Sequence, residues 1–203
     1  MALKAVVFDV GETLVDEERW WRRVADSAGL QPHVVWAALG VTIERGEEHT
    51  ALWGHLGVDS PPSWYETPYS HEDLYPDARE CLERVRRLGF HVGIVGNQTE
   101  ALERWAREEG LPADVISSSA SLGVRKPDPA FFAAVVELVG WSAGETAYVG
   151  DRVDNDVVPA AAAGLVAVHI RRGPWGCLQP TPPQAALGLD NLASLPDALA
   201  SLV

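Results

Sequence analysis

Two aspartates of this 203-residue sequence stand directly beyond apolar runs, and a carboxylate in that position can do chemistry. Asp9 ends the run at residues 5–8, and Asp151 follows the run at residues 146–149 after a single glycine. Continuous apolar runs predict strands buried on both faces, and ligands of open α/β sheets bind beyond the carboxyl ends of such strands. Each aspartate is therefore either a functional group or an ordinary cap at the end of its strand.

Asn97 and Lys126 are the other candidate binding groups. Asn97 follows a third apolar run, at residues 90–95, through Gly96. Its amide and the N–H groups after Gly96 would suit phosphoryl oxygens at a turn, although Asn is also a common turn residue. Lys126 is one of only two lysines, and Pro127 restricts its backbone. We interpret Lys126 as a counter-charge for a carboxylate and a phosphoryl group, the alternative being a surface lysine.

These residue types support phosphoryl transfer. A carboxylate such as Asp9 can attack phosphorus and form an aspartyl-phosphate, which divides hydrolysis into two easier steps. Mg²⁺ would offset the negative charges that meet there, and it needs few protein ligands, which Asp9 and Asp151 could supply. Asp156 lies five residues beyond Asp151, at the predicted start of a helix. It would hold a metal-bound water or simply favour the helix N-terminus.

The order of these motifs resembles the haloacid dehalogenase superfamily of hydrolases, most of whose members are phosphatases. Four motifs follow one another along the chain: a strand that ends at Asp9, a strand that leads to Asn97, the pair Lys126-Pro127, and a strand that leads through a glycine to Asp151 and Asp156. The resemblance implies that Asp9 and Asp151 bind Mg²⁺ together with the backbone carbonyl of Gly11. It also implies that the helical insert after the first strand caps the site.

The sequence departs from the family pattern at Gly11 and Gly96. The family's phosphatases carry, two residues after the nucleophile, an aspartate that protonates the leaving group, and Gly11 has no side chain. Glu12 would point away from that side in an extended chain. We therefore expect a weakened general acid, with slow turnover of alkyl phosphates and faster turnover of esters with acidic leaving groups. At Gly96 the family usually has Ser or Thr, so one phosphoryl hydrogen bond would be lost.

Several side chains of the insert are candidates to replace the missing acid. They are His33, His49, His55, His71, Glu17 and Glu18. A histidine is more often a surface residue than an acid–base group, so none of them is singled out by the sequence.

Related chemistries fit less well. Phosphonate hydrolysis in the superfamily needs a cap lysine, and residues 16–75 contain none. The family's dehalogenases carry an aromatic residue at the Gly11 position and work without metal. The remaining alternative is a catalytically weak protein of the same fold that binds a phosphorylated ligand or partner for regulation, which the glycines at residues 11 and 96 favour.

The composition limits the kinds of binding partner that we expect. The net charge of −13 argues against nucleic-acid binding, and no apolar run is long enough for a membrane span. Two cysteines and an acidic N-terminal turn fit a cytoplasmic protein without a signal peptide. We expect a small phosphorylated substrate and a monomer or homodimer.

Strands alternating with helices predict an α/β fold: a Rossmann-like parallel sheet with helices on both faces, and a small all-helical cap after the first strand. Residues 1–15 and 76–203 would form the core, and residues 16–75 the cap, whose tryptophans we interpret as packing residues. Further strands are expected at residues 114–116 and 165–170. Helices are expected at residues 77–88, 99–110, 128–139, 156–163 and 196–202, and a Pro/Gly loop at residues 171–183.

Overall fold

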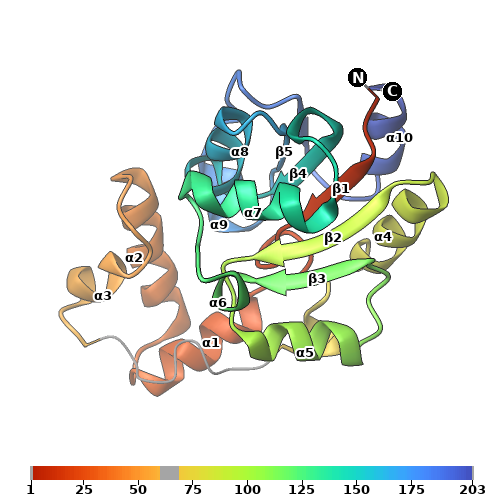
Figure 1. The fold of residues 1–203 in the computed structure, drawn as a ribbon. Coiled ribbons are helices and arrows are strands. Elements are labelled where there is room, and N and C mark those ends of the chain that lie inside the picture. The colour runs from red at the N-terminus through yellow and green to blue at the C-terminus, as the bar shows by residue number, and fades with distance from the viewer. Residues whose placement is uncertain (1, 60–68, 203) are drawn as a thin grey trace.

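The computed structural model describes residues 2–59 and 69–202, and its centre is a parallel six-stranded sheet in the order β3-β2-β1-β4-β5-β6 (Figure 1). The strands are β1 (Ala5–Phe8), β2 (His91–Gly96), β3 (Val115–Ser118), β4 (Thr146–Gly150), β5 (Val166–Ile170) and β6 (Leu187–Leu189). The five predicted strands are confirmed within one or two residues at their ends. The strand that carries Asp9 at its end lies in the middle, between β2 and β4.

Alternate residues of the strands face two separate apolar layers. Val6 and Phe8 of β1 pack toward a cluster that includes residues of α4 (Ala78–Arg87), α5 (Glu100–Glu108) and α10 (Leu195–Ala200). Ala5 and Val7 pack on the opposite face, with α7 (Pro129–Val139) and α8 (Val158–Ala162). Both faces of the sheet are therefore covered, which confirms the predicted Rossmann-like α/β fold.

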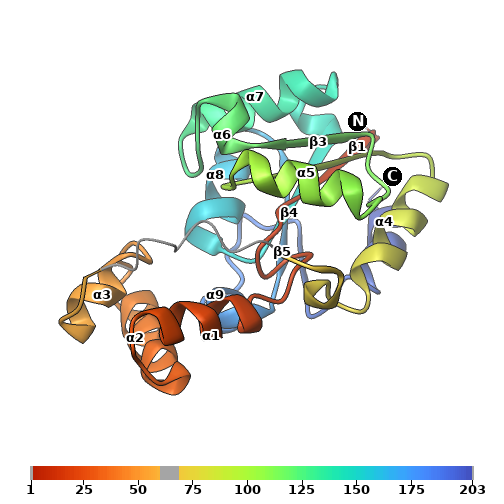
Figure 2. The same cartoon turned by 90° about the horizontal axis from the view of Figure 1, so that it is seen from below.

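The regular elements between β1 and α4 are helices where the structure describes this segment. It contains α1 (Glu18–Ser27), α2 (Pro32–Glu44), α3 (Ala51–Leu56) and the 3-10 turn η1 (His71–Asp73). Helices α1, α2 and α3 lie beside the sheet rather than on its faces (Figure 2) and have their own apolar cluster, which includes the buried Trp21 and Trp53. Of the cap tryptophans predicted to be packing residues, Trp64 lies outside the described residues.

Two sequence predictions near the site are wrong in detail. Residues 171–183 are not entirely a loop, because α9 (Gly173–Leu178) forms within them. Gly173 has a φ of +64° and Pro174 stands in the first turn, where proline suits a helix. The helix predicted from Asp156 instead begins as a π-helical turn, η3 (Val153–Val157), and continues as α8.

Short helices complete the fold. They are α6 (Ser119–Leu122), between β3 and Lys126, and the 3-10 turn η2 (Ala143–Glu145). Among the helices of residues 2–59 and 69–202, each is too short or too polar to cross a bilayer. Because all six strands run parallel, the segments after β1, β2, β3 and β4 emerge at one edge of the sheet, and the predicted site residues lie at these strand ends and in these segments.

Candidate active site

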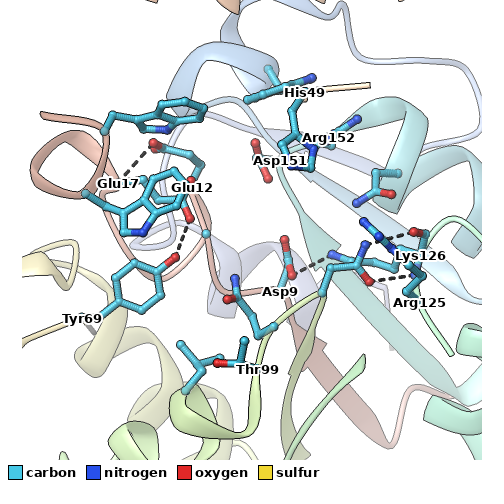
Figure 3. A pocket seen from close by; sticks show the side chains of 18 of the residues that line it. Asp9, Glu12, Glu17, His49, Tyr69, Thr99, Arg125, Lys126, Asp151 and Arg152 are labelled. Atoms are coloured by element: carbon cyan, nitrogen blue, oxygen red, sulfur yellow. Dashed lines mark hydrogen bonds and ion pairs between the residues drawn. The ribbon is translucent and has the colours of Figure 1, made fainter. Parts of the chain in front are cut away.

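A buried lysine joins two of the predicted aspartates. Lys126 Nζ lies 2.7 Å from Asp9 Oδ1 and 2.6 Å from Asp156 Oδ1, as Figure 3 shows for the Asp9 contact. The Lys126 side chain is almost fully buried, and its ammonium group also lies 5.6 Å from the centre of the Tyr148 ring. The interpretation of Lys126 as a counter-charge, rather than a surface lysine, is therefore supported by its position.

Glycines make room for these carboxylates. A Cβ atom on Gly96 would overlap Asp9 Oδ1, and a Cβ atom on Gly150 would lie 2.5 Å from the carboxyl group of Asp156. Such distances do not occur between packed atoms, so a side chain at either position would displace the carboxylate. From the sequence alone, Gly96 is a position that lacks the hydroxyl group usual in the family. In the structure, Gly96 also leaves the space in which Asp9 reaches Lys126.

Asn97 positions the backbone of Lys126. Its Nδ2 donates a hydrogen bond to the Lys126 carbonyl (2.9 Å), and its Oδ1 accepts one from the Lys126 N–H (2.8 Å). The Asn97 amide thus ties the turn after β2 to the loop that carries Lys126. Its predicted contact with a phosphoryl group stays a prediction.

Of the three clustered aspartates, Asp151 is the one whose carboxyl group has no partner among the described residues. It is 3% exposed, and within the described part of the chain no hydrogen bond or ion pair reaches its carboxyl oxygens. Its backbone carbonyl faces His169 Nε2 at 3.0 Å. Carboxyl oxygens of Asp9, Asp151 and Asp156 all lie within 4.8 Å of one another. An all-oxygen donor set of this kind, with one unpaired buried member, fits a hard cation such as Mg²⁺.

Asp156 differs from the other two. Its Oδ1 is paired with Lys126, and its Oδ2 accepts a hydrogen bond from the Arg152 N–H (2.9 Å). Both oxygens are engaged, so Asp156 suits a water-mediated metal contact better than a direct one.

Burial and mutual repulsion set the charges of this cluster. Burial raises the pKa of Asp9 to about 6, although Lys126 lowers it and Asp156 raises it further. Burial, with the charges of Asp156 and Asp9, raises the pKa of Asp151 well above its ordinary value. Burial alone would lower the pKa of Lys126, but the two carboxylates raise it above the usual lysine range. A bound cation would relieve the repulsion between the carboxylates.

Two glutamates follow Asp9 in the turn. Glu12 has a φ of +51° and accepts hydrogen bonds from the Tyr75 hydroxyl (2.5 Å) and the Glu17 N–H (3.3 Å). The Glu17 Oε1 atom accepts a hydrogen bond from the Tyr69 hydroxyl (2.5 Å), as Figure 3 shows. Burial raises the pKa of Glu12 to about 8, with help from Glu17, and that of Glu17 to about 7, with help from Asp9.

A cavity of about 180 Å³ lies between the helical segment and the sheet edge. Asp9, Lys126 and Asp151 line it together with Gly11, Asn97 and Glu17, so the structure brings most of the predicted site residues to one space. Five further residues that were not predicted from the sequence also line this space: Trp105, Trp175, Tyr69, Arg125 and Arg152. They come from distant parts of the chain. The two arginines stand next to the motif residues Lys126 and Asp151 in the sequence, whereas no motif points to the three aromatic residues.

The candidates for the missing acid separate clearly. Of those side chains, only Glu17 and His49 line the cavity. Burial, with the charges of Arg152 and Arg125, lowers the pKa of His49 to about 4. His55 pairs with Glu47, His71 with Glu109, and Glu18 with Arg22.

Comparisons with known proteins agree with this geometry. The model of the haloacid dehalogenase-like hydrolase family matches residues 3–164, and the chain belongs to that family. It is 30% identical to a glyceraldehyde 3-phosphate phosphatase of Methanopyrus kandleri, over 88% of each chain. It is also 30% identical to a phosphoglycolate phosphatase of Rhodospirillum rubrum, over 97% of this chain and 90% of that one.

Solved structures show the same fold. The structure of a HAD phosphatase from Thermococcus onnurineus matches with a TM-score of 0.68 and 25% identity, over 97% of this chain and 98% of that one. A dehalogenase solved with an intermediate complex matches with a TM-score of 0.72 and 22% identity, over 98% of each chain, which shows the shared fold. The protein is therefore a hydrolase of this family, with phosphatases among its relatives.

Proposed function

We propose that the protein is a Mg²⁺-dependent phosphatase of a small phosphorylated metabolite that works through an aspartyl-phosphate on Asp9. The observation that carries the proposal is the buried pair of Asp9 and Lys126 beside the unpaired Asp151. One cavity is therefore lined by a carboxylate that can act as nucleophile, by a lysine held in place beside it, and by an acidic side chain that can bind a metal ion.

In this mechanism Asp9 attacks phosphorus with the carboxyl oxygen that is not paired with Lys126. Lys126 offsets the charge of the incoming phosphoryl group, and Asp156 and Asn97 hold Lys126 in place. Water then hydrolyses the acyl phosphate and restores the Asp9 carboxylate. Asp9, Asp151 and the Gly11 carbonyl would bind Mg²⁺, with Asp156 acting through a water. Bound there, Mg²⁺ supplies positive charge at the phosphoryl oxygens.

The substrate would be small and phosphorylated. The cavity volume of about 180 Å³ suits a short phosphate ester, and the relatives' names refer to esters of that kind. We further propose that residues 16–75 act as a cap, because their described part borders the cavity through Trp20, Trp21 and His49. Residue 11 contributes no acid, so proton donation to the leaving group would be weaker than from an aspartate at that position.

A panel of small phosphate esters tests the proposal. Release of inorganic phosphate that requires Mg²⁺ is the expected result, with the highest rates for acidic leaving groups. If Mg²⁺ and a phosphate analogue raise the melting temperature but no ester on the panel is hydrolysed, the protein binds a phosphorylated ligand instead.

A further inference from the structure

The space beside Gly11 is filled by another residue's carboxyl group. A Cβ atom built on Gly11 would overlap Glu17 Oε1 and would lie 2.9 Å from Glu17 Cδ. Glu17, six positions further along the chain, therefore places its carboxyl group where a side chain of residue 11 would begin. It lines the same cavity as Asp9 (Figure 3).

Contacts from three segments hold Glu17 there. Its backbone stands at the start of α1, where its carbonyl accepts a hydrogen bond from the Trp21 N–H (2.9 Å). Its own N–H donates to Glu12 Oε1 (3.3 Å), which ties it to the turn after β1. Its Oε1 accepts the hydrogen bond from Tyr69, more than fifty residues away (2.5 Å). The position of the carboxyl group is thus fixed by hydrogen bonds.

Glu17 also differs from most acidic residues that the structure describes in having no cationic partner. Among the described residues, no lysine, arginine or histidine forms an ion pair with it, whereas Asp9 and Asp156 share Lys126. The side chains that donate hydrogen bonds to its carboxyl group, Tyr69 and Trp21, are uncharged. A carboxyl group fixed in the same cavity as the nucleophile is placed for proton transfer to a bound ester.

We propose that Glu17 is the general acid and base of this hydrolase, in place of the side chain that residue 11 lacks. This inference rests on the proposed phosphatase function. In the first step Asp9 bonds to phosphorus, the bond between phosphorus and the leaving oxygen breaks, and the Glu17 proton goes to that oxygen. In the second step water attacks the acyl phosphate, gives its proton to Glu17, and the Asp9–phosphorus bond breaks.

The dependence on the leaving group tests the role of Glu17. An alkyl phosphate needs a proton at its leaving oxygen, whereas a nitrophenyl phosphate does not. Glu17→Gln keeps the side-chain shape and an acceptor for Tyr69 but removes the acid. We expect kcat/KM for the alkyl ester to fall about 10²-fold or more, and that for the aryl ester to fall less than about tenfold. The matched control is Glu18→Gln, next in sequence and paired with the exposed Arg22, which should leave both rates unchanged.

A swap variant provides the converse test. Glu17→Ala vacates the space beside Gly11, and adding Gly11→Asp places an acid there from residue 11 itself. The double variant should hydrolyse the alkyl ester faster than Glu17→Ala alone. The single variant Gly11→Asp should gain little, because its side chain must displace the Glu17 carboxyl group.

Two results would overturn the inference. The first is an equal loss of both rates in Glu17→Gln with a raised Mg²⁺ requirement, which would make Glu17 a metal ligand. The second is an unchanged rate for the alkyl ester. The proposed function is judged separately, by whether aryl-ester hydrolysis by the wild type disappears in Asp9→Asn. If the wild type hydrolyses neither ester, both proposals fail.

Discussion

At the scale of one residue, we expect Lys126 to contribute both to the stability of the fold and to the proposed reaction. It is buried between Asp9 and Asp156, so removing its charge leaves two buried carboxylates without a cation. We expect Lys126→Met to lower the free energy of unfolding by about 3–5 kcal/mol at pH 7 and to abolish turnover. Chemical denaturation measures the first effect, with Lys4→Met as control, because Lys4 is the other lysine and is exposed.

The control should change the unfolding free energy by less than about 0.5 kcal/mol. If Lys126→Met were as stable as wild type, the ion pairs would contribute nothing to the fold, and Lys126 would serve catalysis alone.

The glycine at residue 96 departs from the family pattern, and a substitution there distinguishes two explanations of its effect. If the glycine only costs a phosphoryl hydrogen bond, Gly96→Ser should raise the rate. If it provides space for Asp9, as the structure shows, the serine Cβ must push the carboxylate away from Lys126. We expect Gly96→Ser to slow aryl-phosphate hydrolysis and to destabilise the fold by about 1–3 kcal/mol.

Gly40→Ser is the matched control, because a Cβ atom there would meet no other atom within 4 Å. It should leave the aryl-phosphate rate unchanged. A faster Gly96→Ser enzyme would restore the hydrogen-bond explanation.

At the scale of elements, the helical segment is joined to the sheet by a helix from the far end of the chain. Trp175 of α9 is buried in the apolar cluster formed by α1, α2 and α3. The Arg152 guanidinium, just beyond β4, lies 4.7 Å from the centre of the Trp175 ring. His49, between α2 and α3, lines the cavity near the same arginine.

This junction predicts a pH dependence of stability. Burial, Arg152 and Arg125 lower the pKa of His49 from 6.5 to about 4 in the folded protein. Between pH 4 and pH 6.5 the unfolded state therefore binds more protons than the folded state. The His49 contribution to stability is present above pH 6.5 and is lost as the pH falls toward 4. From pH 7 to pH 5 we expect the wild type to lose about 1–2 kcal/mol through this group.

Urea unfolding at the two pH values measures the effect. His49→Gln should lose correspondingly less stability between pH 7 and pH 5, whereas His33→Gln, which changes an exposed histidine of α2, should behave like wild type. An equal loss in His49→Gln and wild type would contradict the account.

The same elements show what the sequence could predict. Apolar runs beside Asp9, Gly96 and Asp151 locate the strands, and parallel strands bring their carboxyl ends together, so the nucleophile and the metal ligands could be proposed from order alone. Glu17 could not be chosen among the acids of the insert, because its place depends on Tyr69. Helix α9 was missed because Gly173 and Pro174 usually mark loops, although both also suit the start of a helix.

At the scale of the whole molecule, an acidic protein places three cations around its candidate site. The net charge is −13, yet Lys126, Arg125 and Arg152 all line the one cavity that also contains Asp9. The cavity is bordered by the strand ends on one side and by the helical segment on the other. Local cations therefore provide the attraction for a phosphate ester that the net charge does not.

The most direct test of this account is hydrolysis of an aryl phosphate with and without Mg²⁺, by the wild type and by Asp9→Asn. Asp26→Asn, on the exposed side of α1, is the matched control. The account predicts Mg²⁺-dependent turnover in the wild type and in Asp26→Asn, and its loss in Asp9→Asn. Equal rates in wild type and Asp9→Asn, at any Mg²⁺ concentration, would contradict the central claim that Asp9 is the nucleophile.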